Sequence, residues 1–337
     1  MGNTFSCASF FSGVGGIDLG FALTGRCETI YANEYDRKAA ETFDANNLVK
    51  TDCRDIHEVQ AHDVPDVDII LAGFPCQAFS IDGKRQGFHD EKGRGVLFFE
   101  VARIIEEKKP RVVFLENVKN LVTHDKGNTF LVITNTLKEL GYTVSYQVLN
   151  ASRYGNIPQN RERVYIVCFR DREDASRFVF PEPIPLTVTV PDIIDYHTKV
   201  DDKYYYTPGR YKSDIYEQLV DAIDDDAAVY QSRRNYIRKN KTGVIPTLTA
   251  AQGGGGHNVS IVKTDYGIRK MTPRECFRAQ GFPDDFVLPD TVSESRLYKQ
   301  SGNSVCVPVI TRIAENVVNA LEGVTPHTHT PQESILG

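Results

Sequence analysis

Short apolar runs alternate with longer amphipathic stretches through the first half of the chain. Apolar, β-branched runs bounded by turn residues indicate buried strands, and apolar residues spaced three or four apart indicate helices. Strands that alternate with helices are typical of an open α/β sheet. The sequence therefore predicts a mostly parallel, doubly wound α/β domain. We expect its strands at 5–11, 28–34, 67–72, 111–115, 142–150 and 164–169, and helices from 17 and at 96–109 and 130–140.

The pattern changes after Arg170. The proline-rich stretch Pro181–Pro185 predicts a linker to a second, smaller and more irregular unit. Two further helices are predicted at 270–280, with Thr272 as N-cap and Pro273 in its first turn, and at 303–323. Residues 324–337 predict a flexible tail.

Charge and cysteine content limit the class of protein. A net charge of −6 excludes a uniformly basic protein that coats DNA, so local patches must supply any phosphate contacts. Seven dispersed cysteines without a Cys-x-x-Cys pair argue against a disulfide framework or a metal site, and favour a reducing, cytosolic setting. No apolar run reaches the roughly 18 residues of a membrane span.

The first predicted strand leads into a glycine turn that includes Gly13 and Gly15. Such a turn lets a ligand approach the backbone at a helix N-terminus. Glu34, which ends the next strand, is placed to bind a ribose, and Asp55 is placed to accept a bond from an adenine amine. The alternatives are a turn that only packs helix on strand, a solvent-facing Glu34, and an Asp55 that caps a turn. Together these residues favour a ligand that carries adenosine.

Several reactive groups follow predicted strands. Cys76 comes just after Pro75, which ends the strand at 67–72, and the alternative is that Cys76 is a small buried hydrophobe. The glycine-rich segment 81–95, which includes Lys84 and Arg85, predicts a mobile lid suited to phosphates. Glu116 follows the strand at 111–115. Arg161 and Arg163 point to one side of an extended segment, or else form a surface ion-pair pattern.

The densest basic run lies at 231–241 and carries Arg233, Arg234 and Arg238 beside Tyr236. It predicts a DNA-binding patch, and a solvated basic turn is the alternative. Thr247 follows shortly after it, ahead of four consecutive glycines.

Six stretches together resemble the cytosine-5 DNA methyltransferases of bacterial restriction–modification systems. They are FFSGVGGIDLGF at 10–21, GFPCQAFS at 73–80, ENVKN at 116–120, IPQNRERVYIVCFR at 157–170, RKMTPRECFRAQGFPDDF at 269–286 and YKQSGNSVCVPVI at 298–310. Six blocks in one order are far more specific than any single motif. The resemblance covers nearly the whole chain except about 171–245.

The resemblance implies S-adenosylmethionine as cofactor, bound by Phe11, Gly13, Gly15, Glu34, Asp55, Ile56, Pro75, Asn303 and Ser304. It implies a Rossmann-like catalytic domain of residues 1–180 and 291–323, interrupted by a target-recognition domain at 181–290 in which Thr247 contacts a phosphate. The expected substrate is double-stranded DNA, protected in this way from a partner restriction endonuclease. We expect a cytoplasmic bacterial monomer without a membrane or metal.

The same resemblance gives the catalytic residues their roles. Carbon 5 of cytosine is a poor nucleophile until a thiolate adds to carbon 6 and turns the ring into an enamine. Cys76 would be that thiolate, Glu116 would meet ring nitrogen 3, Arg163 would bind the carbonyl oxygen, and Arg161 would position Glu116 or a phosphate. The base must first leave the duplex.

Two rival interpretations stay open from the sequence. One is an RNA (tRNA) cytosine-5 methyltransferase with the same blocks, and the other is a DNA-binding protein that has lost catalysis. A nicotinamide oxidoreductase is disfavoured because its glycine fingerprint is absent. The sequence identifies neither the target site, nor the residue that fills the gap left by the flipped base, nor the base that removes the carbon 5 proton.

Overall fold

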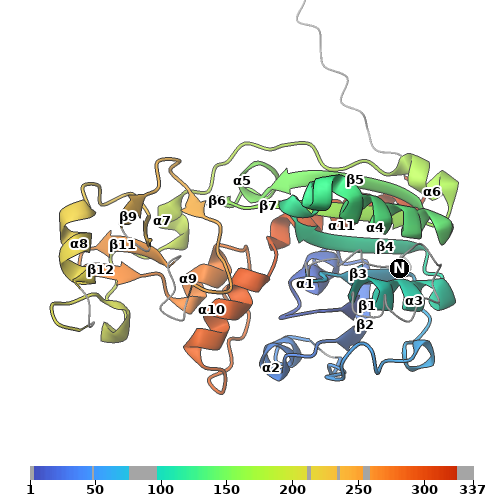
Figure 1. Cartoon of the computed structure of the whole chain (residues 1–337), viewed down its shortest axis with the longest axis horizontal. Coiled ribbons are helices and arrows are strands. Elements are labelled where there is room, and N and C mark those ends of the chain that lie inside the picture. The colour runs from blue at the N-terminus through green and yellow to red at the C-terminus, as the bar shows by residue number, and fades with distance from the viewer. Residues whose placement is uncertain are drawn as a thin grey trace, which may run out of the picture.

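The computed structural model describes residues 4–47, 49–75, 97–210, 214–233, 236–252 and 259–324. Figure 1 shows a large unit built on a central sheet and a smaller unit beside it, with helices α9 and α10 between them. Cys76, Lys84, Arg85, Arg234, the predicted lid at 81–95 and the tail beyond residue 324 lie outside the described residues.

The large unit holds a six-stranded sheet in the order β2-β1-β3-β4-β7-β5. Parallel pairing joins the first four strands of that order, whereas β7 runs antiparallel to both of its neighbours. The predicted mostly parallel α/β fold is therefore confirmed. The strands are β1 (Phe5–Phe10), β2 (Cys27–Asn33), β3 (Ile69–Ala72), β4 (Val112–Val118), β5 (Thr143–Asn150) and β7 (Glu162–Phe169).

Helices cover both faces of this sheet, because side chains alternate from one face of a strand to the other. Cys7 and Leu71 pack with α1 (Gly16–Ala22) and α11 (Val307–Leu321) in one core, whereas Ala8 and Ile70 pack with α3 (Leu97–Lys108) and α4 (Asn128–Glu139) in a second core. Two shorter helices in this unit are α2 (Arg37–Asp44) and α6 (Arg172–Arg177).

Two predicted boundaries were wrong. Strand β4 continues past residue 115 to Val118, because Glu116 and Asn117 pair with Tyr165 and Val164 of the antiparallel β7. The helix predicted at 303–323 is α11, which begins only at Val307, because the chain is extended at Ser304 and Pro308 lies in the first turn of the helix. The sequence missed α10 (Glu294–Asn303), which precedes it. The predicted N-cap of α9 (Pro273–Arg278) is confirmed, since the Thr272 side chain accepts from the backbone N–H of Glu275.

The smaller unit contains an antiparallel four-stranded sheet in the order β12-β11-β8-β9. A short parallel pair, formed by β6 (Gln159–Asn160), just ahead of β7, and β10 (Ile245–Pro246), joins the smaller unit to the large one. The four strands of this sheet are β8 (Tyr230–Ser232), β9 (Ile237–Lys239), β11 (Ser260–Thr264) and β12 (Gly267–Lys270). The other short helices of the described chain are α5 (Ala151–Tyr154), α7 (Val190–Ile193) and α8 (Ile215–Ala222). The 3₁₀ turns are η1 (Ala61–Asp63), η2 (Lys119–Val122), η3 (His124–Gly127) and η4 (Asp202–Tyr204). The domain boundaries at 180/181 and 290/291 stay a prediction.

No single helix of the described chain is long and apolar enough to cross a membrane. Helices α10 and α11 have the necessary length and composition only together, and they meet at a bend of 41°.

Candidate active site

Glu116 and Arg163 form a sheltered ion pair at the carboxyl end of β4. Arg163 Nε lies 3.1 Å from Glu116 Oε1, and both side chains are largely buried. Burial raises the pKa of the Glu116 carboxyl above its ordinary value, and the positive charges of Arg163 and Arg161 partly oppose that rise. A carboxyl whose pKa is raised in this way holds a proton more readily than an exposed one, which suits a general acid.

The end of β3 runs directly beside this carboxyl. A Cβ added to Gly73 would lie 3.6 Å from Glu116 Oε2, and Asn117 Nδ2 donates to the Phe74 carbonyl oxygen over 2.8 Å. The chain is therefore fixed next to Glu116 two residues before Cys76. The sequence predicted no role for Asn117. Its position directly after Glu116, at the end of a predicted strand, could have indicated one.

Arg161 lies elsewhere than the sequence suggested. Its guanidinium is 2% exposed and donates to the backbone carbonyls of Leu248, Gly302 and Ser304. The expected contacts with a phosphate or directly with Glu116 are not what this geometry provides, because the donors face carbonyls from two distant segments. Arg161 influences Glu116 through its charge alone.

The glycine turn has the backbone that its sequence predicted. Phe11, Gly13 and Gly15 all have positive φ, of 53°, 57° and 83°. Glu34 Oε2 accepts from the Gly13 N–H and Oε1 from the Asp36 N–H, each over 2.8 Å. A Cβ on Gly13 would meet nothing within 4 Å, so the turn leaves open space beside its backbone. These residues fit a nucleoside ligand, because the turn is open and a carboxylate stands next to it.

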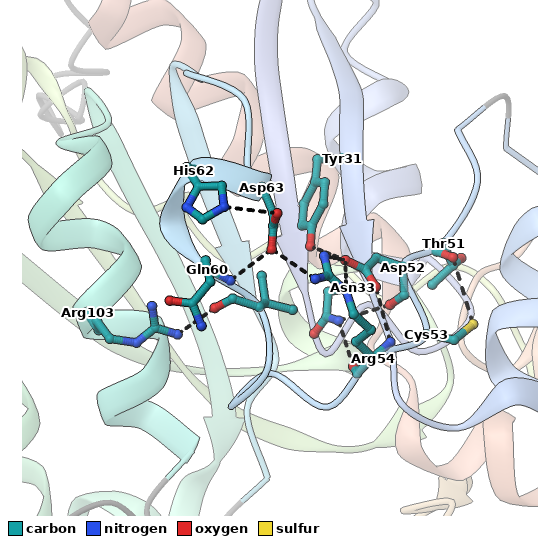
Figure 2. Close-up of polar contacts among 11 residues, drawn as sticks. Tyr31, Asn33, Thr51, Asp52, Cys53, Arg54, Gln60, His62, Asp63 and Arg103 are labelled. Atoms are coloured by element: carbon teal, nitrogen blue, oxygen red, sulfur yellow. Dashed lines mark hydrogen bonds and ion pairs between the residues drawn. The ribbon is translucent and has the colours of Figure 1, made fainter.

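A polar network fixes the loop that carries Asp55 and Ile56 (Figure 2). Arg54 pairs with Asp52 over 2.6 Å and with Asp63 over 2.9 Å, and Asn33 Nδ2 donates to the Asp52 and Arg54 carbonyls. The side chain of Asp55 is half exposed and accepts from the His57 N–H, as a turn cap does.

Within that loop, Ile56 is 2% exposed and packs in the core beneath it. Pro75 is exposed at the last described position before Cys76. The polar network around Arg54 therefore fixes this loop, and the side chains of Asp55 and Ile56, which are expected at adenine, take no part in that network.

The carboxyl-terminal block returns to the glycine turn. Asn303 ends α10 and is exposed, and Ser304 follows it. Ser304 Oγ lies 2.6 Å from where a Cβ of Gly16 would stand, at the N-terminus of α1. The structure thus places Glu34 against Gly13 and Ser304 against Gly16, at the two ends of the same turn, and the cofactor role of these residues stays a prediction.

A sequence model of the C-5 cytosine-specific DNA methylases matches residues 5–319. The chain belongs to this family. It is 56% identical over 314 residues to the Type II methyltransferase M.Bsp6I of Bacillus sp. (strain RFL6), covering 93% of this chain and 98% of that protein. It is 41% identical over 316 residues to the Type II methyltransferase M.HhaI of Haemophilus parahaemolyticus, covering 92% of this chain and 93% of that protein.

The methylase also shares its fold with more distant solved structures. A DNMT2 variant from Spodoptera frugiperda matches with a TM-score of 0.71 at 20% identity, and the match covers 94% of this chain and all of that chain. The DNMT2 of S. pombe matches with a TM-score of 0.70 at 16% identity, and the match covers 95% of this chain and 99% of that chain. At these identities the likeness extends to the fold alone.

The candidate DNA contacts of the methylase lie in the smaller unit. Gln231 is 2% exposed, and its Oε1 accepts from both Arg233 and Arg238. Lys239, in the same basic run, is instead paired with Asp224 and Asp225 at 2.9 and 3.1 Å. The basic run is therefore less uniform than its sequence suggested, because Lys239 is paired with acids whereas Arg233 and Arg238 share Gln231.

Thr247 also faces the protein in the described structure, since its hydroxyl donates to the Asn160 carbonyl. Among the described residues, no three His, Cys, Asp or Glu side chains group as a metal site would need.

Proposed function

We propose that this methylase transfers a methyl group from S-adenosylmethionine to carbon 5 of a cytosine flipped out of a short, specific site in duplex DNA. The observation that carries the proposal is the buried Glu116–Arg163 pair beside Gly73, at the end of the strand that leads to Cys76. Family membership supports DNA as the substrate.

The roles of the chain's own groups follow from this geometry. The Cys76 thiolate adds to carbon 6, and Glu116 gives a proton or a hydrogen bond to ring nitrogen 3, where negative charge develops. The nearby guanidinium of Arg163 binds the ring carbonyl oxygen. After carbon 5 takes the methyl group, it loses its proton to solvent and the carbon–sulfur bond breaks, which returns the thiolate.

S-adenosylmethionine supplies the methyl group. Phe11, Gly13, Gly15 and Glu34 would hold it, together with Asp55, Ile56, Pro75, Asn303 and Ser304. The open space beside Gly13 and the adjacent Glu34 carboxylate support this assignment.

The biological setting is inferred from the relatives, which are named Type II methyltransferases of bacteria. We infer that this methylase protects host DNA from a paired restriction endonuclease, and that it acts in the cytoplasm as a monomer without a membrane. Contacts with the duplex come from Arg233, Arg234, Arg238 and Thr247, and from Lys84 and Arg85 in the lid.

The test is transfer of tritium from labelled S-adenosylmethionine to unmethylated duplex DNA and, separately, to tRNA. We expect label in the duplex, mapped to cytosine by bisulfite sequencing. Because the adduct needs a thiolate, Cys76→Ala should lose transfer while it still binds DNA.

A 5-fluorocytosine duplex should trap a covalent complex with the wild-type protein and none with Cys76→Ala. Full activity of Cys76→Ala would refute the nucleophile. Label that appears in tRNA instead of DNA would refute the substrate.

A further inference from the structure

Three segments that are far apart in the sequence meet at Arg161. They are residues 158–161 ahead of β7, residues 245–249 of the recognition region, and residues 300–304 at the end of α10. Arg161 Nη1 donates to the Leu248 carbonyl over 2.9 Å, and Nη2 donates to the carbonyls of Gly302, over 3.2 Å, and Ser304. One buried guanidinium thus holds the backbone of the recognition region and of the cofactor block.

Two buried glutamines strengthen the same junction. Gln159 Oε1 accepts from the Leu248 N–H over 3.2 Å, and its Nε2 donates to the Ala279 carbonyl over 2.5 Å. Gln280 Nε2 donates to the Ser301 carbonyl over 2.7 Å. Both glutamines are fully buried. Backbone polar groups at this junction are therefore satisfied by side chains from another segment, and a shift of one segment would break bonds of the next.

The junction is also packed without spare room. A Cβ on Gly302 would collide with the Thr249 carbonyl, so the recognition region and the end of α10 are in backbone contact there. Ser304 in turn packs on Gly16, directly after the glycine turn that includes Gly13 and Gly15. The contacts run without a gap from Leu248 through Arg161 and Ser304 to the glycine turn.

A buried guanidinium is an expensive way to join backbones if stability is the only gain, because its desolvation is large. Burial lowers the pKa of Arg161 to about 9, so it stays charged at neutral pH. Its Nε has no hydrogen-bond partner among the described residues. Arg161 therefore leaves its Nε–H without an acceptor in the described structure, while its other guanidinium nitrogens join its own segment to residues 245–249 and 300–304.

We propose that Arg161 is a positioning residue that couples the two binding events of the methylase. Through Arg161, duplex bound at the recognition region and cofactor bound at the glycine turn each strengthen the binding of the other. This inference rests on the proposed function, since it concerns the same two sites. Coupling between two ligands is reciprocal, so either affinity can report it.

The experiment measures the dissociation constant of S-adenosylhomocysteine by calorimetry, with and without a cytosine-containing duplex that carries the site mapped by bisulfite sequencing. For the wild-type chain we expect the duplex to tighten S-adenosylhomocysteine binding on the order of tenfold. In Arg161→Lys, which keeps the charge but loses the fork of donors, this factor should fall toward one.

Arg312→Lys is the matched control. Arg312 also donates to two backbone carbonyls, those of Tyr154 and of Glu182 in the linker, at 2.8 and 2.9 Å, and through them it contacts neither residues 245–249 nor residues 300–304. We expect it to lower the melting temperature and leave the coupling factor unchanged.

Gly302→Ala disturbs the same junction while Arg161 stays intact, because the added methyl group collides with the Thr249 carbonyl. It should also reduce the coupling factor. The inference is overturned if the wild-type factor is one, or if Arg161→Lys and Gly302→Ala keep the wild-type factor. Equal weakening of both affinities in Arg161→Lys with an unchanged factor would make Arg161 merely structural. Absence of methyl transfer to DNA by the wild-type chain would instead contradict the proposed function.

Discussion

At the scale of single residues, burial decides what the charged groups do. Glu116 keeps a raised pKa because it is desolvated, and Arg163 remains close enough to share its charge. Arg161, two residues from Arg163, is turned toward backbone carbonyls, whereas Arg163 pairs with Glu116. Alternation along the strand would have placed both arginines on one side, but the partners available to each are different.

Asp18 shows the same effect in a residue outside the chemistry. Burial raises its pKa from 3.8 to about 6, although the Ser9 and Thr29 hydroxyls both donate to it. An acid whose folded pKa lies above its unfolded value contributes stability below about pH 4. That stability is lost as the pH rises through about 6.

Asp18→Asn should therefore raise the free energy of unfolding at pH 7.5 by on the order of 2 kcal/mol, because the buried charge is gone. The gain over wild type should shrink as the pH falls to 5. Urea denaturation at both pH values measures it, with the exposed Asp290→Asn as a control that changes stability by less than about 0.5 kcal/mol. A variant that is less stable than wild type at both pH values would contradict the prediction.

At the scale of elements, strand pairing fixes the position of Glu116, and backbone geometry fixes the glycine turn ahead of α1. Strand β4 extends to Val118 because β7 supplies hydrogen-bond partners for Glu116 and Asn117, so the acid stands on a rigid strand. Helix α1 begins at a glycine turn in which Gly13 and Gly15 have positive φ, and such a backbone is accessible mainly to glycine. Without a side chain at Gly13, the turn leaves its backbone open to a ligand.

A comparison of alanine variants at two glycines distinguishes the effect of backbone strain from the effect of contact with a ligand. Gly13 and Gly25 have φ of 57° and 69°, and an added Cβ meets nothing within 4 Å at either. Gly13→Ala and Gly25→Ala should each lower the free energy of unfolding by about 1–2 kcal/mol, the cost of a left-handed alanine.

Only Gly13→Ala should weaken S-adenosylhomocysteine binding, by tenfold or more, because its methyl group enters the proposed cofactor site. Denaturation and calorimetry on both variants measure the two effects. Equal cofactor affinity in the two variants would move the cofactor away from Gly13.

At the scale of the whole molecule, a methylase that acts on DNA must bind a polyanion although the chain carries a net charge of −6. Local placement resolves this, because phosphate contacts act over short distances at physiological salt. Lys239 is neutralised by Asp224 and Asp225, whereas Arg233 and Arg238 share the buried Gln231.

Replacing Arg233, Arg234 and Arg238 with glutamine should weaken duplex binding and flatten its salt dependence. The slope of log K against log salt should become shallower by about 0.9 for each phosphate that an arginine no longer neutralises. Titrations of duplex at several salt concentrations measure this.

The control replaces the exposed Lys50, Lys138 and Arg172 with glutamine, which changes the net charge equally, from −6 to −9. A slope that matches wild type in the first variant would place the interface elsewhere.

The sequence by itself determined the alternation of strands and helices, the N-cap of α9 and the open glycine turn. These depend on local patterns of two and 3.6 residues and on backbone freedom at single positions. It also predicted that Glu116 stands at the carboxyl end of its strand, because chain direction fixes which end of a parallel strand carries a residue. The family resemblance rests on those same local stretches, and the match over residues 5–319 confirms it.

Only the tertiary structure decided which partner each charged group has. The carbonyls that accept from Arg161 lie 87, 141 and 143 residues away in the sequence. Asp224, which pairs with Lys239, lies 15 residues before it. The extension of β4 required the antiparallel β7, which pairs with Glu116 and Asn117. Desolvation and pairing are properties of packed neighbours, so no local pattern of residues contains them.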